Sequence, residues 1–366
     1  MDKIRGVNTG NWMVLEKWMY PDLFAGTEAD DEDDLARMLT REQLAERLDA
    51  HRATYVTQED FRYIASLGLN TVRVPVPHFI FDDCPPYYGC LGTLDNAFDW
   101  AEAAGIKVLI DLHTAPDSQN GFDNGGITGV CKWHKKPENI ERTIEVLERM
   151  AQRYKDHPAL YGIQFLNEPI SPEMFDRIVS SGRYKPRDAE RAAGSEGVPI
   201  EVLYDFYTRA YDRLRRHLDE DVALVFHDGF RLKAWKDFMR GPEYKNVVLD
   251  THIYIGMMGM GAPGGEQAFD LHGFMERALV QSAADIREMR EFFPVVVGEL
   301  SVMHRPGSMG SPLQERAAIR AMGAAQLYTW EQVDGWFFWS YRVKSGAPGW
   351  DMGDLVKKGH LAAEYA

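Results

Sequence analysis

Short apolar runs alternate with amphipathic segments along this whole chain. The apolar runs are rich in β-branched and aromatic residues and are bounded by Gly, Pro or polar residues, which is typical of buried strands. Strands that are apolar on both faces occur in parallel sheets covered by helices. The predicted strands are residues 4–8, 71–76, 107–113, 161–166, 223–228, 247–254, 293–299 and 335–341.

The segments between these runs have helical spacing and helix-capping residues. They cover residues 40–51, 57–68, 94–104, 138–154, 201–218, 271–291 and 313–331. Eight strands that alternate with helices predict an α/β fold, a closed (β/α)₈ TIM barrel that forms a single domain over residues 1–366 with loop insertions. The second candidate fold is an open doubly wound sheet. It is less favoured because no Gly-rich phosphate-binding loop follows the first strand.

Three segments do not follow the alternation. Residues 170–199 are polar and rich in Arg, Gly and Ser, and we interpret them as an insertion or lid. Residues 28–34 form an acidic run, for which we expect a solvated surface position. Residues 256–265 form a loop rich in Met and Gly.

Composition narrows the class of partner. A net charge of −15 argues against nucleic acid and against anionic membrane surfaces. The chain has three cysteines, an odd number that implies no disulfide framework, and we expect inert thiols in a reducing compartment. It opens without an apolar signal region and contains no membrane-spanning run, so the expected location is cytoplasmic. The sequence leaves the oligomeric state open.

Polar residues gather at the ends of the predicted strands, where α/β barrels place their catalytic groups. Glu168 follows Asn167 after the fourth strand, and Glu299 ends the seventh. Two such carboxyl groups are the catalytic groups required for glycosidic bond cleavage. One acts as an acid that keeps its proton, and the other is ionised. The other residues near strand ends are Asn8, Arg73, His113, His227, His252, Tyr254 and Trp339.

Several motifs together resemble the family-5 glycoside hydrolases, and within them the exo-β-1,3-glucanase branch. The similarity runs from the first strand to the last. The motifs are Arg5-Gly6-Val7-Asn8, Trp12 to Glu16, Val72-Arg73-Val74-Pro75, Asp111-Leu112-His113, Ser118 to Asn124, Leu166-Asn167-Glu168-Pro169, His252-Ile253-Tyr254, Gly298-Glu299 and Phe338-Trp339-Ser340.

The resemblance implies a retaining β-glucosidase or exo-β-1,3-glucanase that acts on an oligosaccharide or β-glucoside and needs no cofactor and no metal. Glu168 is then the acid/base and Glu299 the nucleophile, which Arg73, His252 and Tyr254 order and ionise. The remaining implied roles are Asn167 on the 2-hydroxyl, His113 and Asn124 on the sugar, Glu16 on the far hydroxyls of a terminal glucose, Trp339 as the platform beneath the ring and Phe122 near the entrance.

The chain departs from the family pattern at three places. It has Gly10-Asn11 where the family often has Gly-Gly, Glu299-Leu300 where it often has Glu-Trp, and Met257 and Met258 where an aromatic residue is expected. These departures concern the leaving-group side and leave the linkage open.

Other functions compete with this interpretation. An endo-β-glucanase or a transglycosylase of the same family is one alternative, and a catalytically inactive carbohydrate-binding barrel is another. A metallohydrolase barrel is a third, suggested by Asp111, His113 and His252, although the first strand lacks a His-x-His pair.

Overall fold

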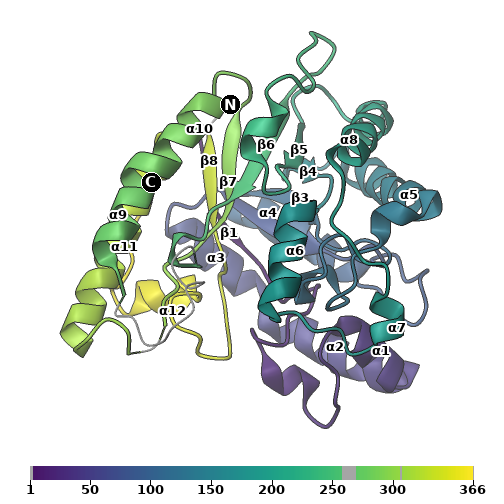
Figure 1. Cartoon of the computed structure of the whole chain (residues 1–366), viewed down its shortest axis with the longest axis horizontal. Coiled ribbons are helices and arrows are strands. Elements are labelled where there is room, and N and C mark those ends of the chain that lie inside the picture. The colour runs from purple at the N-terminus through teal and green to yellow at the C-terminus, as the bar shows by residue number, and fades with distance from the viewer. Residues whose placement is uncertain (1–2, 258–268, 306, 366) are drawn as a thin grey trace.

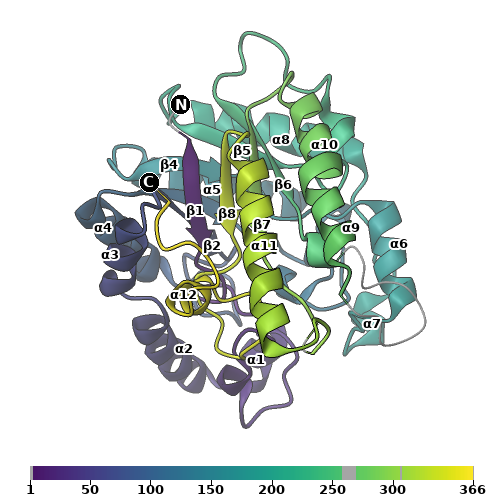
Figure 2. The ribbon, with the colours of Figure 1, turned by 90° about the vertical axis from the view of Figure 1, so that its left-hand side faces the viewer.

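A computed structural model describes residues 3–257, 269–305 and 307–365 as a closed barrel of eight parallel strands in the order β1 to β8. Figures 1 and 2 show the strands at the centre and the helices around them. The predicted (β/α)₈ barrel is therefore confirmed. Among the described residues, no helix combines the length and the hydropathy that a membrane crossing requires.

The strands lie where the hydrophobic pattern predicted them, with several ending earlier. They are β1 Ile4–Asn8, β2 Thr71–Val76, β3 Lys107–Leu112, β4 Leu160–Gln164, β5 Ala223–His227, β6 Val247–His252, β7 Val295–Leu300 and β8 Gly335–Phe338. Pairing of β1 with β8 closes the barrel, with Gly6 opposite Phe337. The polar residues that follow the apolar runs mostly lie in the loops beyond the strand ends.

The predicted helices are also present, with shifted ends. They are α2 Arg41–Tyr55, α3 Gln58–Ser66, α4 Leu91–Ala104, α5 Pro137–Tyr154, α8 Ile200–Arg215, α9 Leu271–Glu276, α10 Ala283–Met289 and α11 Pro312–Trp330. A π-helical turn, η6 Arg277–Ser282, joins α9 to α10. Thr57 and Asp60 form the predicted capping box of α3.

Short helices lie outside this alternation and were not predicted. They are α1 Glu32–Met38, α6 Pro172–Ser181, α7 Ala189–Ala192 and α12 Met352–Lys357. Single turns of 3₁₀-helix are η1 Pro21–Phe24, η2 Asp123–Gly125, η3 Trp133–Lys135, η4 Leu232–Trp235 and η5 Ile255–Met257. Most of the Met- and Gly-rich loop, from residue 258 on, lies outside the described residues.

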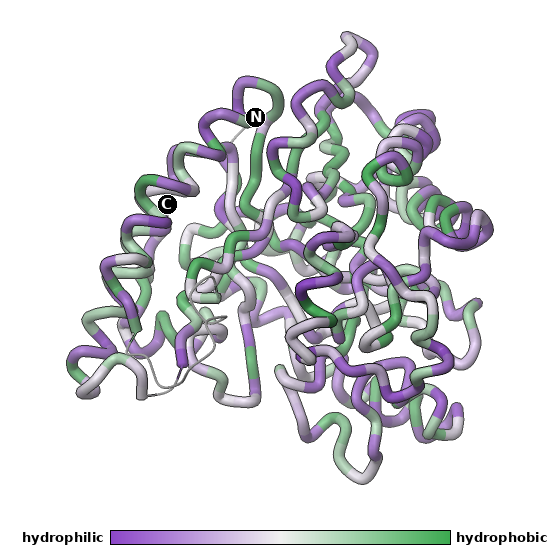
Figure 3. Tube along the Cα trace, viewed as in Figure 1, coloured by the Kyte–Doolittle hydropathy of each residue, from purple (hydrophilic) through white to green (hydrophobic). Residues whose placement is uncertain are grey.

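Two apolar layers hold the barrel together. Inside it, Ile4, Leu109, Val225, Val248 and Phe337 pack against one another and are fully buried or nearly so. A larger cluster fills the space between the strands and the helices. In Figure 3 the outer helices alternate between hydrophilic and hydrophobic colours, as expected for helices with one buried face.

A local irregularity shapes the catalytic end of β7. The pairing of β6 with β7 shifts between Thr251 and His252, so that His252 lies opposite Glu299. The extra residue, Gly298, donates its N–H to Asp250 Oδ1 at 2.7 Å. A Cβ on Gly298 would lie 2.3 Å from that oxygen, so a side chain is excluded there. Bulges of this kind are common next to active sites, where they redirect a side chain.

The acidic segment, residues 28–34, contradicts its predicted solvated position. Asp31, Glu32 and Asp33 are buried, and α1 begins within the segment. Asp33 is ion-paired with Arg37 and with Arg191, which belongs to the insertion of residues 170–199. The prediction was wrong because the cationic partner comes from a distant part of the chain.

Candidate active site

The two candidate carboxylates lie at the carboxyl ends of β4 and β7. Glu168 stands in the loop after β4, where its φ of 45° is in the left-handed region that non-glycine residues rarely adopt. Such strained backbone is frequent at functional sites. Glu168 is 5% and Glu299 3% exposed, so both are largely removed from solvent.

Glu299 has a donor on each oxygen. Arg73 donates from Nη1 to Oε1 at 2.9 Å, and the Tyr254 hydroxyl donates to Oε2 at 2.5 Å. Both partners were predicted from the sequence. Burial raises the pKa of Glu299, against the lowering effect of His252 and Arg73.

Arg73 is completely buried and connects several strand ends. Besides Glu299, it donates to Gln164 Oε1, Asn8 Oδ1 and Asn167 Oδ1 at 2.8–2.9 Å, and its Nη2 lies 3.0 Å from Asp111 Oδ2. A buried guanidinium needs such compensation for its lost hydration. Arg73 therefore fixes β1, β2, β3, β4 and β7 relative to one another.

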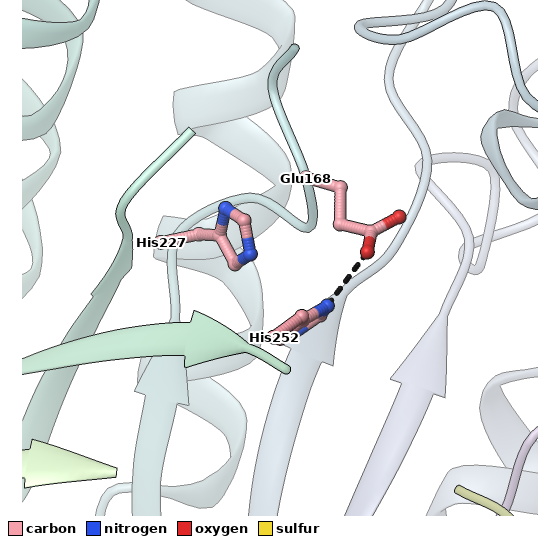
Figure 4. A group of neighbouring side chains, drawn as sticks. All are labelled: Glu168, His227 and His252. Carbon is pink, nitrogen blue, oxygen red and sulfur yellow. Dashed lines mark hydrogen bonds and ion pairs between the residues drawn. The ribbon is translucent and has the colours of Figure 1, made fainter. Parts of the chain in front are cut away.

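His252 contacts both carboxylates. The sequence placed it beside Glu299, but its Nδ1 lies closer to Glu168, 2.7 Å from Oε1 (Figure 4). Glu299 Oε2 lies 3.4 Å from the same nitrogen. The Nε2 of His252 lies 3.2 Å from Asp250 Oδ2. Since an ionised carboxylate can only accept hydrogen bonds, carboxylates at both ring nitrogens favour the doubly protonated imidazolium. The charges of Glu299 and Asp250 outweigh burial and raise the pKa of His252 well above its usual value.

This arrangement corrects the expectation that Glu168 holds its own proton in the free protein. Burial raises the pKa of Glu168, but the hydrogen bond and the charge of His252 outweigh burial and set the pKa at about 2. The proton of this pair therefore rests on His252 Nδ1, one hydrogen bond away from Glu168.

The predicted sugar-binding residues Asn167, His113 and Trp339 lie together. His113 Nδ1 is 2.5 Å from Asp111 Oδ2, so Nδ1 donates, and Nε2 faces Asn167 Nδ2 at 3.3 Å. The Trp339 ring stacks on His113, with ring centroids 5.4 Å apart and planes inclined by 8°. Gly10 lies against this indole, because a Cβ there would come within 2.7 Å of it.

Glu16 lies in the loop after β1 and is 4% exposed. Its Oε2 accepts from Trp18 Nε1 at 2.8 Å, and its backbone N–H donates to Asn11 Oδ1 at 2.8 Å. Asn11 has a φ of 61°, which explains why asparagine can replace the family's glycine there. Glu16 Oε1 is buried and has no hydrogen-bond partner among the described residues. Burial and the charge of Asp123 raise the pKa of Glu16 well above its usual value.

Asn124 and Phe122 come from the loop that follows β3. Asn124 donates from Nδ2 to Glu168 Oε2 at 3.0 Å. Phe122 is 9% exposed and packs against Tyr184 and Phe230. The structure thus brings both residues to the Glu168 side of the site.

Glu168, His227 and His252 offer ligand atoms within 4.8 Å of one another, which raises the question of a metal site (Figure 4). Tetrahedral donors with bonds of about 2.0–2.2 Å stand about 3.4 Å apart, whereas His252 Nδ1 and Glu168 Oε1 are 2.7 Å apart. Gly229 donates its N–H to His227 Nδ1 at 2.9 Å, which leaves the proton on Nε2. This donor set fits a hydrogen-bonded acid–base group rather than a metal site.

A cavity of about 780 Å³ opens elsewhere, between α2 and α4. Trp12, Arg52, Tyr88 and Trp100 are among its lining residues, and none of the candidate catalytic or sugar-binding residues lines it. The candidate active site is therefore located by the convergence of its polar side chains.

The sequence analysis missed several residues that support the site. Gln164 donates to Asp250 Oδ2 at 2.7 Å, and both are fully buried. Trp18 holds Glu16, while Tyr184 and Phe230 pack beside Phe122. A polar residue inside an apolar strand was the available signal for Gln164 and Asp250. No local signal distinguishes Tyr184 or Phe230 from other loop aromatics.

Comparisons with known proteins agree with this geometry. Residues 41–345 match glycosyl hydrolase family 5 (Cellulase). The probable glucan 1,3-beta-glucosidase A of Emericella nidulans is 35% identical over 398 residues, covering 98% of this chain and 89% of that protein. A glucan 1,3-beta-glucosidase of Blumeria graminis is 29% identical over 407 residues, which cover 98% of this chain and 86% of that protein.

Solved structures share the fold. A rutinosidase from Aspergillus niger has a TM-score of 0.77 at 21% identity, with 98% of each chain covered. An endoglucanase from Thermotoga maritima has a TM-score of 0.58 at 16% identity, with 99% of this chain and 97% of that chain covered. At these identities the similarity extends to the barrel and no further.

Proposed function

Since this chain belongs to glycosyl hydrolase family 5 and is a glycoside hydrolase, we propose that it releases terminal glucose from β-1,3-glucans or related β-glucosides with retention of configuration. The observation that carries the proposal is the pair Glu168 and Glu299, whose oxygens both contact His252 Nδ1, at 2.7 and 3.4 Å. One oxygen of Glu168 and one of Glu299 therefore lie closer together than the sum of the two distances, which fits the roughly 5–5.5 Å separation of the carboxyl groups in a retaining pair.

Glu299 is the nucleophile in this proposal. Its Oε1 and Oε2 are held by Arg73 and Tyr254, so the carboxylate cannot rotate freely. The positive charge of Arg73 favours the ionised form that attacks the anomeric carbon. Attack forms a glucosyl ester on Glu299 and breaks the bond to the leaving oxygen.

Glu168 is the acid/base. It receives the proton stored on His252 Nδ1 through their 2.7 Å hydrogen bond and passes it to the leaving oxygen. In the second step Glu168 takes a proton from water, and the resulting hydroxide displaces Glu299 from the sugar. The same His252 then takes the proton back, which restores the resting state.

Terminal-glucose specificity rests on Glu16. Its buried, unpartnered Oε1 is available to accept a hydrogen bond from a sugar hydroxyl. Trp339 and His113 are stacked on each other and would supply an aromatic face with polar edges for the same sugar ring. A carboxylate that binds the far hydroxyls of a glucose leaves no room for a chain to continue beyond it.

Preference for a β-1,3 linkage is drawn from the relatives named glucan 1,3-beta-glucosidase. Product analysis on β-1,3-, β-1,4- and β-1,6-linked glucosides tests it, with glucose expected as the first product from the β-1,3 substrate. Early release of longer oligosaccharides would indicate an endo-β-glucanase. NMR of the first product should show the β-anomer, and initial α-anomer would refute the double displacement.

The catalytic assignment has its own test. Glu299→Gly should abolish hydrolysis of an aryl β-glucoside, and added azide should restore turnover and give the α-glucosyl azide. Glu59→Gln is the control, since the Glu59 side chain is 79% exposed. Turnover by Glu299→Gly without azide would show that Glu299 is not the nucleophile, and a different mechanism would then have to be considered.

We also propose that the protein works in a reducing compartment. Cys84, Cys90 and Cys131 are all unpaired, and burial raises the pKa of Cys90 to about 12, which makes its thiol unreactive. Thiol titration of the protein isolated from its native source under non-reducing conditions should find three free thiols. A blocked or bridged cysteine would argue for an oxidising compartment.

A further inference from the structure

Trp350, in the loop after β8, lies between two aromatic residues from different parts of the chain. Its ring centroid is 5.0 Å from that of Trp18 and 5.2 Å from that of Tyr254, with the planes inclined by 58° and 54°. Trp350 is 8% exposed and belongs to the apolar cluster that contains Trp339. Tilted aromatic pairs at these distances are favourable contacts, so Trp350 braces both neighbours at once.

The two neighbours of Trp350 hold different carboxyl groups of the site. Trp18 donates from Nε1 to Glu16 Oε2 at 2.8 Å. Tyr254 donates its hydroxyl to Glu299 Oε2 at 2.5 Å. Contacts therefore run without a break from the residue proposed to bind the far end of the sugar to the proposed nucleophile.

The loop that carries Trp350 is anchored to the ends of β7 and β8. Trp350 O accepts from the Ser340 N–H at 2.8 Å, and Gly349 O accepts from the Val302 N–H at 3.2 Å. Gly349 has a φ of 81°, and a Cβ there would lie 2.2 Å from Val302 O, so a side chain is excluded. Close-packed groups have low compressibility. A ring held in this way passes a displacement of one neighbour on to the other.

The two neighbours themselves depend on Trp350 for their positions. Trp18 and Tyr254 are only partly buried, so the core alone does not fix them. At the start of the series, Glu16 Oε1 is buried without a partner among the described residues. A sugar hydroxyl bound to Oε1 would fix the Glu16 carboxyl group and, through Oε2, the Trp18 ring.

We propose that Trp350 is a positioning residue that couples the binding of a terminal sugar at Glu16 to the orientation of Tyr254 and of the nucleophile Glu299. This inference rests on the proposed function. A chain end that fills the Glu16 end of the site thereby aligns the attacking carboxylate, and binding energy from a remote part of the substrate is used at the reacting centre.

Direct electrostatics is the competing explanation for any coupling between the two ends. Burial raises the pKa of Tyr254 well above its usual value, and the charge of Glu16 is among the smaller contributions in the same direction. The two residues therefore influence each other through space as well. An experiment must separate this influence from contact through Trp350.

The test is a double-mutant cycle of Glu16→Ala and Tyr254→Phe, measured as kcat/KM on 2,4-dinitrophenyl β-glucoside. Independent residues change kcat/KM by factors that multiply to within about twofold. Coupling should make Tyr254→Phe at least about threefold less damaging in the Glu16→Ala background than in wild type, because Tyr254 has already lost its position there. Factors that simply multiply overturn the coupling.

The same cycle in Trp350→Leu should give factors that multiply, and coupling that persists there would assign it to direct electrostatics and overturn the role of Trp350. Trp18→Phe keeps a ring but removes the bond to Glu16, so it should also abolish the coupling. This variant tests the series of contacts even if Trp350→Leu does not fold, and coupling that survives in it overturns the proposal.

Tyr328→Leu is the control for the loss of an aromatic ring, because Tyr328 on α11 is 70% exposed, and it should retain the wild-type coupling. Loss of coupling in this control would overturn the specific role of Trp350. Wild-type protein that releases no dinitrophenolate overturns the proposed function itself, whereas normal turnover without coupling overturns only the role of Trp350.

Discussion

Glu16 decides whether the site recognises a chain end, and Glu16→Ala is its most direct test. Trp18 occupies Oε2 at 2.8 Å, whereas Oε1 is buried without a partner among the described residues. A sugar hydroxyl that donates to Oε1 would favour the ionised form of Glu16 and make one charge-assisted hydrogen bond with it, worth about 1.5–3 kcal/mol. Loss of that bond in the transition state should lower kcat/KM about 10- to 150-fold.

The fold should survive this substitution. An unsatisfied buried carboxyl contributes no stability, and only the bond to Trp18, worth about 0.5–1.5 kcal/mol, is lost. Trp18→Phe removes the same bond while leaving Glu16 in place, so it separates support of the carboxylate from contact with the sugar. Its kcat/KM should fall less than that of Glu16→Ala, and both variants should unfold in urea near the wild-type midpoint.

The assay compares aryl β-glucoside with aryl β-galactoside, which differ at the 4-hydroxyl. Wild type should strongly favour the glucoside, and Glu16→Ala should reduce this preference because the discriminating contact is gone. Unchanged kcat/KM together with an unchanged glucoside preference would refute the reasoning. Exo action would then depend on the insertion of residues 170–199 closing the cleft.

Three further substitutions and one treatment test the electrostatics. Arg73→Lys should lower the free energy of unfolding by about 3–5 kcal/mol, because buried carboxylates lose their guanidinium partner. The control Arg62→Ala removes an exposed ion pair and should cost less than about 1 kcal/mol. Equal losses in the two variants would contradict this prediction. His252→Asn should move the basic limb of kcat/KM to lower pH, since Glu168 must then hold the proton itself; an unmoved limb would exclude the shared proton. Burial raises the pKa of Asp33, but the ion pair with Arg191 lowers it more, to about 2. The contribution of Asp33 to the free energy of unfolding should therefore be complete above its unfolded pKa of about 3.9 and disappear as pH falls through 2. Asp33→Asn should flatten that part of the curve of stability against pH. Incubation with EDTA should leave kcat/KM unchanged, and a loss restored by zinc would favour a metallohydrolase.

The sequence alone determined the architecture and the main catalytic candidates. Strand and helix signals are local, because they depend on the spacing of apolar residues within a few turns. Once eight strands alternate with helices, their carboxyl ends must converge, so Glu168 and Glu299 are brought together by topology alone. Arg73 and Tyr254 followed from the family's motifs, and both contact Glu299 as expected.

Tertiary structure alone decided which charges meet. His252 stands between two carboxylates and lies closer to Glu168. It is next to a shift in the pairing of β6 and β7, which no sequence pattern reveals. Within the acidic segment, Asp33 is buried with its charge paired, because Arg191 reaches it from 158 residues away in the chain. Tyr184 reaches Phe122 for the same reason, since the insertion is fixed by ion pairs across the fold. Contacts between residues far apart in the chain depend on the position of the whole backbone, and a local pattern carries no information about them.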